Sequence, residues 1–283
     1  MNPQKLLRLA AATLVAAVVT ALAPALCAQT AGTYSASGLA KLHQGDNDGA
    51  IADYTKALEL NSSYLGAYIG RGAAMTNQGN FDGAIADFNA AMKLKSTFPD
   101  AYLGRGMAEF LQGNLDAAIM DSTKAIELQP DSRAAYYQRA LARGAETNFQ
   151  GATEDFTKAL GFKGANDSIS DYIALYGSLF GLRTGHVVEE WLKAPTAWST
   201  AWTKELGSFL AKQTSEADLQ KFASTKGGED KAVQVAEAAY FSAVVQLVAG
   251  NKAAAKADFQ KSLDASGDAT VVHRLARVDL DRS

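Results

Sequence analysis

The sequence is poor in the residues that build cross-linked, metal-bound or loop-rich folds. It has one cysteine, Cys27, in 283 residues, which excludes an intrachain disulfide and a zinc site made of several thiolates. It has five prolines against 55 alanines, a balance that favours helices over strands and loops. The 27 basic residues do not outnumber the 30 acidic ones, so no net positive field would attract nucleic acid. With 48% hydrophobic residues, the chain can form a globular core.

Long apolar runs are also absent, apart from one at the N-terminus. Lys5 and Arg8 precede an almost wholly apolar stretch, residues 9–22, and a proline and small residues follow up to Ala28. This three-part layout predicts a secretory signal peptide over residues 1–28. The run is shorter than the ~20 apolar residues that a membrane-spanning helix needs. We therefore expect an exported, periplasmic protein that has no membrane span.

The exact processing of this N-terminus stays open. Cleavage after Ala28 would remove the only cysteine, and cleavage after Cys27 would do the same. A bacterial lipoprotein would instead be cut just before a lipid-bearing Cys27. The bulky Leu26 directly before the cysteine disfavours that alternative, because the lipoprotein peptidase requires a small residue there.

The strongest pattern in the rest of the chain is a 34-residue repeat. Many independent series of residues share this period, which excludes a chance origin. These series are Gly45, Gly79 and Gly113; Ile51, Ile85 and Ile119; Asp53, Asp87, Asp121 and Asp155; Ala57, Ala91, Ala125 and Ala159; Tyr34, Tyr68, Tyr102 and Tyr136; and Gly38, Gly72, Gly106 and Ala140.

Each 34-residue unit is predicted to form two helices. In residues 65–98, apolar and small residues first recur at helical spacing, then Gly79 interrupts the pattern, and a second apolar stripe follows. The small residues Gly72 and Ala84 would let the two helices approach closely, with Phe88 filling the space beside them. Neither helix can bury its apolar stripe alone, so the units must stack.

These features resemble the tetratricopeptide repeat. The matching frames are residues 31–64, 65–98, 99–132 and 133–166, with an alanine followed four residues later by an aromatic residue in three of them. Those pairs are Ala50 and Tyr54, Ala84 and Phe88, and Ala152 and Phe156, whereas Ser122 follows Ala118. The resemblance implies an all-α fold in which the helix pairs stack into a right-handed solenoid.

The remaining chain is predicted to be helical but less regular. Residues 167–235 form an irregular helical segment, and residues 236–283 form a further tetratricopeptide-like repeat with a closing C-terminal helix. Within them we expect helices over residues 171–182, 239–249 and 271–280, a helix capped by Ser215, and a linker over residues 224–230. This order of parts resembles bacterial envelope proteins of the NlpI lipoprotein type.

Groups that could carry catalysis are not brought together by the sequence. His43, His186 and His273 lie far apart, and none has a histidine or cysteine at metal-ligand spacing. No phosphate-binding glycine loop, serine nucleophile motif or zinc-protease motif occurs. We therefore predict no enzyme activity, cofactor or metal. The alternative is an envelope enzyme with its active site in residues 167–235, using His186, Glu189 or Glu190.

Two further sets of residues have a structural and a functional interpretation. Arg71, Arg105 and Arg139 take the repeat position where leucine is usual, and they could form an ion-pair ladder with the periodic aspartates or bind an acidic ligand. We favour the ladder, but spacing does not decide whether each arginine pairs within its own unit or with the preceding one. For the clustered Trp191, Trp198 and Trp202 we favour core packing over a binding hot spot.

The resemblance also implies a binding surface. In this family the first helix of each unit lines the concave side of the stack, where this chain would present an apolar groove. Its residues would be Ile69, Ala73, Leu103, Met107, Phe110, Leu111, Tyr137 and Leu141. The function so implied is a non-catalytic scaffold or adaptor of the bacterial cell envelope that binds a protein or peptide segment, with envelope proteases or cell-wall hydrolases as candidate partners. Alternatively, the chain's own C-terminal helices or a second protomer cover part of the groove.

Overall fold

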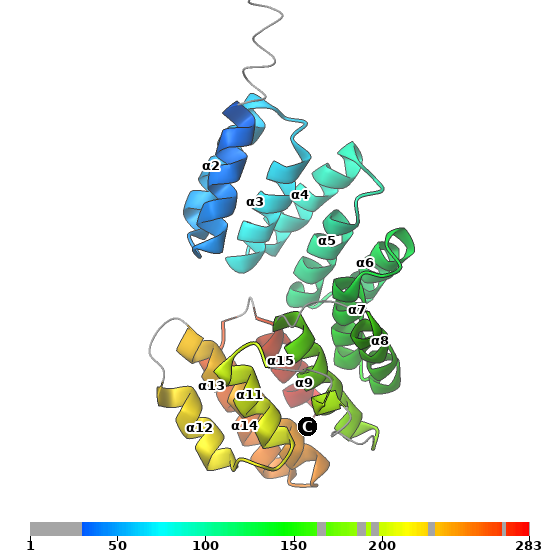
Figure 1. Cartoon of the computed structure of the whole chain (residues 1–283), viewed down its shortest axis with the longest axis vertical. Helices are drawn as coiled ribbons and strands as arrows, with labels where there is room; N and C mark the ends of the chain where they lie inside the picture. The colour runs from blue at the N-terminus through cyan, green and yellow to red at the C-terminus, as the bar shows by residue number, and fades with distance from the viewer. Residues whose placement is uncertain are drawn as a thin grey trace, which may run out of the picture. The chain divides into compact units, whose positions relative to one another are not determined.

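The computed structural model describes residues 30–162, 168–185, 191–193, 198–225, 230–267 and 270–282. All regular secondary structure in these residues is helical, and helix pairs joined by short turns follow one another along the chain (Figure 1). The predicted all-α solenoid of tetratricopeptide repeats is confirmed. The predicted signal peptide, residues 1–28, lies outside the described residues. None of the described helices is both long and apolar enough to span a membrane.

The chain divides into two compact units, of which the first ends at Ser96. Its described part starts with a helix over residues 30–43. The other helices are α2 (Asn47–Leu60), α3 (Leu65–Asn77) and α4 (Phe81–Leu94). Helix α3 packs against both α2 and α4. The helices therefore form two antiparallel pairs of the kind that the 34-residue period predicts.

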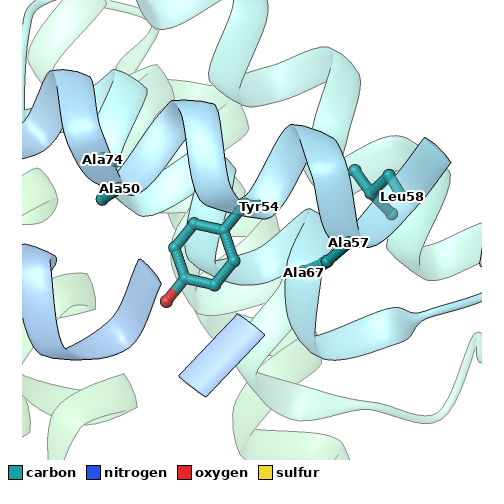
Figure 2. Packing of buried hydrophobic residues seen from close by; sticks show 6 residues of the cluster. All are labelled: Ala50, Tyr54, Ala57, Leu58, Ala67 and Ala74. Carbon is teal, nitrogen blue, oxygen red and sulfur yellow. The ribbon is translucent and has the colours of Figure 1, made fainter. Parts of the chain in front are cut away.

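The core of the first unit consists of small residues around one aromatic ring. Tyr54 is buried among alanines of α2 and α3 and Leu58 (Figure 2). A Cβ atom at Gly70 would lie 2.2 Å from the Tyr54 ring, and one at Gly72 would lie 2.9 Å from the Phe88 ring. Both distances are shorter than van der Waals contact, so only glycine fits there. This confirms that small residues allow the close approach of the helices.

The second unit contains the rest of the chain. Helices α5 to α9 pack in sequence order, and α15 packs on α5, α7, α13 and α14. Helix α13 also packs on α9, α11, α12 and α14. The helices are α5 (Pro99–Gln112), α6 (Leu115–Leu128), α7 (Arg133–Ala145), α8 (Phe149–Gly161), α9 (Ser168–Arg183), α11 (Ala201–Leu210), α12 (Glu216–Thr225), α13 (Asp230–Val248), α14 (Lys252–Ala265) and α15 (Val271–Arg282).

The turns between paired helices repeat the same two devices. A residue with positive φ ends the first helix, at Gly45, Gly79 and Gly113, because glycine has no Cβ to clash in this conformation. The next residue caps the second helix: the side chain of Asp46, Asn80 or Asn148 accepts a hydrogen bond from the backbone N–H three residues later. In the fourth repeat, a threonine (Thr147) takes the position of the glycine and has φ 69°.

Several expectations for the less regular part agree with the structure, and one differs. Helices α9 and α15 contain the segments 171–182 and 271–280, and Ser215 accepts a hydrogen bond from the backbone N–H of Asp218. However, the helix expected over 239–249 starts earlier, since α13 begins at Asp230. Its first turns contain no glycine or proline that would prevent helix formation. The expected linker is shortened accordingly, because residues 224 and 225 complete α12; residues 226–229 lie outside the described residues.

Candidate functional site

The predicted groove residues lie on the first helices α3, α5 and α7, but they differ in accessibility. Five of them, Ile69, Ala73, Leu103, Met107 and Tyr137, are half-buried. Three are buried within the second unit, where Phe110 is 3% exposed, Leu111 4% and Leu141 1%. A partner could contact the first group without unfolding the chain, but not the second.

Helix α15 covers the first helices of the second unit. It packs against α5 and α7, and its arginines bind the carboxyl-terminal ends of both. Arg274 Nε donates a hydrogen bond to the Leu111 carbonyl at 3.1 Å, and Arg282 Nη1 donates to the Ala145 carbonyl at 2.6 Å. Both carbonyls lie in the last turn of their helix, where the helix dipole favours a cation.

These two carbonyls occupy the same position in successive repeats. Leu111 and Ala145 are one repeat apart, and Arg274 and Arg282 are eight positions apart on α15, so α15 runs across neighbouring repeats. The element that covers α5 and α7 is thus a C-terminal helix of the chain itself. This agrees with the alternative that the chain's own C-terminal helices, and not a second protomer, cover part of the groove.

The periodic arginines form the expected ion-pair ladder. Each arginine binds the aspartate 16 residues later, which lies in the second helix of the same repeat. The arginine Nε and Nη2 donate hydrogen bonds to the two carboxylate oxygens. The distances are 2.7 and 2.8 Å for Arg71–Asp87, 2.7 and 2.6 Å for Arg105–Asp121, and 2.9 and 2.7 Å for Arg139–Asp155. These hydrogen bonds raise the pKa of all three arginines above its ordinary value.

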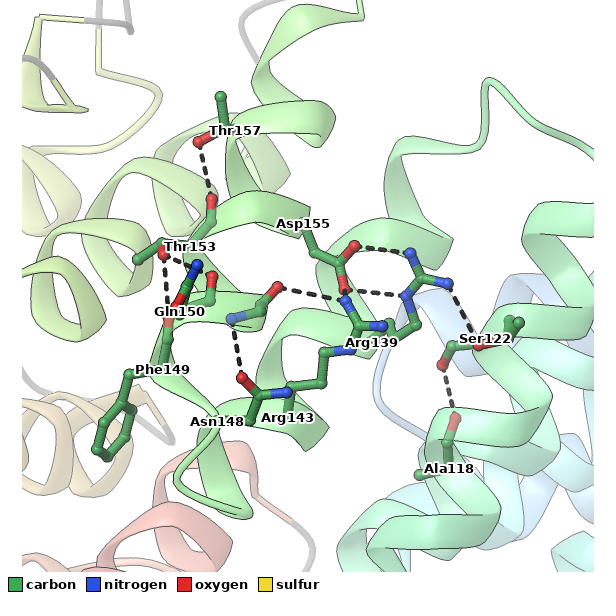
Figure 3. A network of polar contacts seen from close by, with 12 residues as sticks. Ala118, Ser122, Arg139, Arg143, Asn148, Phe149, Gln150, Thr153, Asp155 and Thr157 are labelled. Atoms are coloured by element: carbon green, nitrogen blue, oxygen red, sulfur yellow. Dashed lines mark hydrogen bonds and ion pairs between the residues drawn. The ribbon is translucent and has the colours of Figure 1, made fainter. Parts of the chain in front are cut away.

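The fourth repeat adds a second arginine to this ladder. Figure 3 shows Asp155 between Arg139 and Arg143, whose Nη1 lies 2.8 Å from Asp155 Oδ2. Arg139 also donates a hydrogen bond to Thr123 in the preceding 34-residue repeat, at 3.3 Å. The ladder therefore holds the two helices of one repeat together, and the bond to Thr123 links two neighbouring repeats. These arginines have a structural role and are not presented to a ligand.

In two other helix pairs a serine takes the position of the arginine, 16 residues before the aspartate. Asp53 accepts hydrogen bonds from Lys41 and Ser37, at 2.7 and 2.6 Å, and these lower the pKa of Asp53. In the late repeat, Ser242 donates to Asp258 at 2.9 Å, again across 16 residues. Burial raises the pKa of Asp258. The geometry of the N-terminal units thus recurs in α13 and α14.

The tryptophans pack against helix glycines, as expected. A Cβ at Gly177 would lie 2.4 Å from the Trp191 ring, and a Cβ at Gly207 would lie 2.6 Å from the Trp198 ring. Trp202 is buried in α11 and stacks on Phe222, with 6.1 Å between ring centroids. Core packing is therefore the main role of this cluster.

The groups considered for catalysis do not form a site in the described part of the chain. His43 is exposed, and His273 is buried between Ser266 and Arg277. His186, Glu189 and Glu190 lie outside the described residues. Among the described residues, no group of three histidine, cysteine or acidic side chains could hold a metal.

Two buried polar groups in the second unit are not indicated by the repeat pattern. Arg183 forms a bidentate ion pair with Asp279, at 2.8 and 2.6 Å, which joins α9 to α15. Glu237 on α13 is buried beside Trp202, Tyr172 and a pocket. The only sequence signal for Glu237 is its place in the otherwise apolar run Val235–Phe241.

Comparisons with known proteins identify the repeat type. A profile described as TPR repeat matches residues 38–79, and a profile described as tetratricopeptide repeat matches residues 77–132. No curated protein sequence matches the chain.

Solved structures are similar in fold. The Cut9–Hcn1 hetero-tetramer of APC/C matches with a TM-score of 0.59 and 17% identity, over 88% of this chain and 42% of that chain. Pseudomonas aeruginosa pilF matches with a TM-score of 0.53 and 15% identity, over 84% of this chain and 92% of that chain. The first TPR of Spaghetti (RPAP3), solved with an HSP90 peptide, is 28% identical over 42% of this chain and 95% of its own, with a TM-score of 0.41.

The period, the helix pairs, the packing of small residues against aromatic rings and the two profile matches lead to one conclusion. The repeats make the chain a scaffold for protein–protein interaction. It is a tetratricopeptide-repeat protein.

Proposed function

We propose that this chain is a non-catalytic adaptor that binds a helical segment of another protein on the first helices of its N-terminal unit. The surface consists of Leu39, Ile69 and Ala73. Leu39 and Ala73 are one repeat apart and take the same repeat position as the half-buried Met107 and the buried Leu141. The proposal rests on one observation: α15 packs on the first helices α5 and α7 of the second unit, whereas Leu39 on a first helix of the first unit is 48% exposed.

The second unit supplies an example of what this face binds. There, α15 lies on the first helices and places arginines on carbonyls at positions 111 and 145. The equivalent positions in the first unit are His43 and Asn77, which also end first helices. A partner helix with apolar residues on one side and basic residues about two turns apart would match this surface, because accessible apolar residues favour a protein partner.

Site-specific photo-crosslinking tests the surface. A benzophenone amino acid at position 39 or 69 is expected to crosslink to a discrete partner protein in the producing cell. Leu60 and Leu94 are the matched controls, since they are exposed leucines of the first unit but end its second helices. Equal crosslinking from Leu60 and Ile69 would refute the surface. The substitution Ile69→Ser should remove the crosslink from position 39 while the protein stays folded.

We also propose that the protein acts in the bacterial cell envelope. The signal-peptide pattern of residues 1–28 and the resemblance of the layout to the NlpI type support this location, and envelope proteases or cell-wall hydrolases would be the partners. Protein purified from the envelope fraction should begin at Gln29 or Ala28. An intact Met1 or a lipid-modified Cys27, detected by mass spectrometry, would contradict that processing.

The non-catalytic part of the proposal follows from the sequence, in which no catalytic motif occurs. No observation favours the alternative of an enzyme site in residues 167–235. The partner's activity, measured with and without the chain, should therefore change in rate or location, whereas the chain alone should turn over no envelope substrate.

A further inference from the structure

The second unit contains a pocket of about 210 Å³ that is separate from the predicted groove. The two share only one residue, Tyr137. Helices α7, α9, α13 and the start of α15 form its walls, and Val233, which is partly exposed, lies at its rim. Its volume is below the ~300–1,000 Å³ of pockets for drug-sized ligands. It therefore suits a small molecule or a single side chain. Its lining residues are Tyr137, Tyr172, Tyr176, Val233, Glu237, Thr270, Val271 and Val272.

Glu237 gives this mostly apolar pocket a single acidic group. The residue is 4% exposed, and its Oε2 accepts hydrogen bonds from Trp202 Nε1 at 2.6 Å and from the Tyr172 hydroxyl at 3.4 Å. Within the described part of the chain, Oε1 accepts no hydrogen bond and no cation forms an ion pair with the carboxylate. A buried carboxylate without a counter-charge is costly, and a cation in the pocket would offset that cost.

The tyrosines provide the other groups that bind a cation. The rings of Tyr172 and Tyr176 are stacked with 6.0 Å between centroids and 26° between planes. The hydroxyls of Tyr137 and Tyr176 make no hydrogen bond to any described residue. Burial raises the pKa of all three tyrosines, so they stay neutral. Aromatic faces next to a carboxylate attract ammonium and guanidinium groups.

We propose that this pocket binds a small organic cation, an alkylammonium or alkylguanidinium, with Glu237 as its counter-charge and the tyrosines as its walls. Two sources share this chemistry: a free amine, and the side chain of a lysine or arginine in another protein. The proposal does not rest on the adaptor function, because its residues lie in the second unit and the adaptor surface lies in the first.

Binding should depend on pH. Burial raises the pKa of Glu237 to about 7, and only the ionised carboxylate attracts the cation. The titratable groups facing Glu237 are Tyr172 and Tyr176 from α9 and Tyr137 from α7; α11 contributes the non-titrating Trp202, and α15 contributes valines. An alkylammonium stays protonated in this range. Affinity should therefore rise by about tenfold between pH 6 and pH 8.

The hydrogen bond from Trp202 supplies the readout. We would titrate the full chain with n-butylammonium and follow the indole Nε1–H resonance of Trp202, assigned from the Trp202→Phe variant. A saturable shift is expected with butylammonium and none with 1-butanol, its neutral counterpart. Glu237→Gln should abolish the shift, because the amide keeps an acceptor for the indole but not the charge. Glu154→Gln is the matched control, since it removes an exposed carboxylate on α8.

A second titration separates the two sources. A lysine blocked at both backbone ends but free at its ammonium should bind as butylammonium does if the pocket accepts a protein side chain. If only the free amine binds, the ligand is a small molecule. No saturable shift with either probe, or an equal shift with 1-butanol or with Glu237→Gln, would overturn the proposal. Crosslinking from Ile69 should be the same in Glu237→Gln, so a failure here is distinguishable from a failure of the adaptor function.

Discussion

The turn between paired helices shows how one residue carries strain. Gly79 and Gly113 have positive φ without a Cβ, whereas Thr147 takes the same repeat position with φ 69°. A left-handed conformation costs a β-branched residue roughly 1–2 kcal/mol. The fourth repeat therefore carries a local penalty that the second and third repeats avoid.

Reciprocal substitutions should reveal this penalty. Thr147→Gly is expected to raise the free energy of unfolding by about 1 kcal/mol, and Gly79→Thr is expected to lower it by a similar or larger amount. Gly79 is a clean position for the second change, since a Cβ there would meet no atom within 4 Å. Urea denaturation of both variants measures the effects, and a destabilised Thr147→Gly protein would contradict this explanation.

Glu237 should make stability depend on pH. Its pKa is raised to about 7 in the folded chain from 4.5, so the folded state binds the proton more tightly than the unfolded state does. The resulting stabilisation is fully present below pH 4.5 and is lost as pH rises through 7. The total is on the order of 3 kcal/mol, at about 1.4 kcal/mol per pKa unit.

The Glu237→Gln variant isolates this effect. Relative to the variant, the unmodified chain should lose on the order of 3 kcal/mol between pH 5 and pH 8. Tryptophan fluorescence in urea measures it in the correct unit, because all three tryptophans lie there. Glu154→Gln should keep the pH dependence of the unmodified chain; if Glu237→Gln also keeps it, the carboxyl does not titrate in this range.

The ion-pair ladder should stabilise the chain far more than surface pairs do. Asp155 is mostly buried and binds Arg139 and Arg143. Asp155→Asn leaves both cations without their counter-charge, and we expect a loss of about 3 kcal/mol. The matched change Glu127→Gln removes the exposed partner of Lys124 and should cost at most about 0.5 kcal/mol. Equal losses in the two variants, measured by denaturant unfolding, would show that the ladder is not stabilising.

At the scale of elements, α15 is held in place by its ends. Arg274 and Arg282 bind carbonyls at the ends of α5 and α7, and Asp279 pairs with Arg183 of α9 between them. Contacts at three helices make α15 part of the core of the second unit.

Removing the two terminal contacts should loosen α15. In the double variant Arg274→Gln and Arg282→Gln, two charge-assisted hydrogen bonds of about 1.5–3 kcal/mol each are weakened. Amide hydrogen exchange in α15 should accelerate by at least tenfold, while α2 to α4 keep their protection. Lys256→Gln, an exposed change of the same charge on α14, serves as the control. Unchanged exchange in α15 would mean that its apolar face alone holds it.

At the scale of the whole molecule, the stack of helix pairs should need no metal. Its stability comes from packing between neighbouring repeats, and no metal site is predicted. A chelator such as EDTA should therefore leave the melting temperature unchanged. A drop of several degrees, reversed by added zinc or calcium, would reveal a site that neither the sequence nor the described residues indicate.

The repeating part of this protein can be recognised from local sequence patterns. The 34-residue period specifies helix pairs and gives three of them an arginine and an aspartate, but only the structure shows that each arginine binds the aspartate 16 residues later. Helix ends follow from local residues such as Gly79 and Asn80. These features could be predicted because periodicity and capping act over short distances along the chain.

Which helix faces are covered depends on contacts between elements that lie far apart in the sequence. Periodicity shows that the first helices have an apolar face, but not that α15, from a distant part of the sequence, packs on α5 and α7. Likewise, Glu237 meets Trp202 and Tyr172 from two other helices. A local pattern specifies what a side chain needs to contact, whereas the element that supplies the contact depends on how distant helices pack.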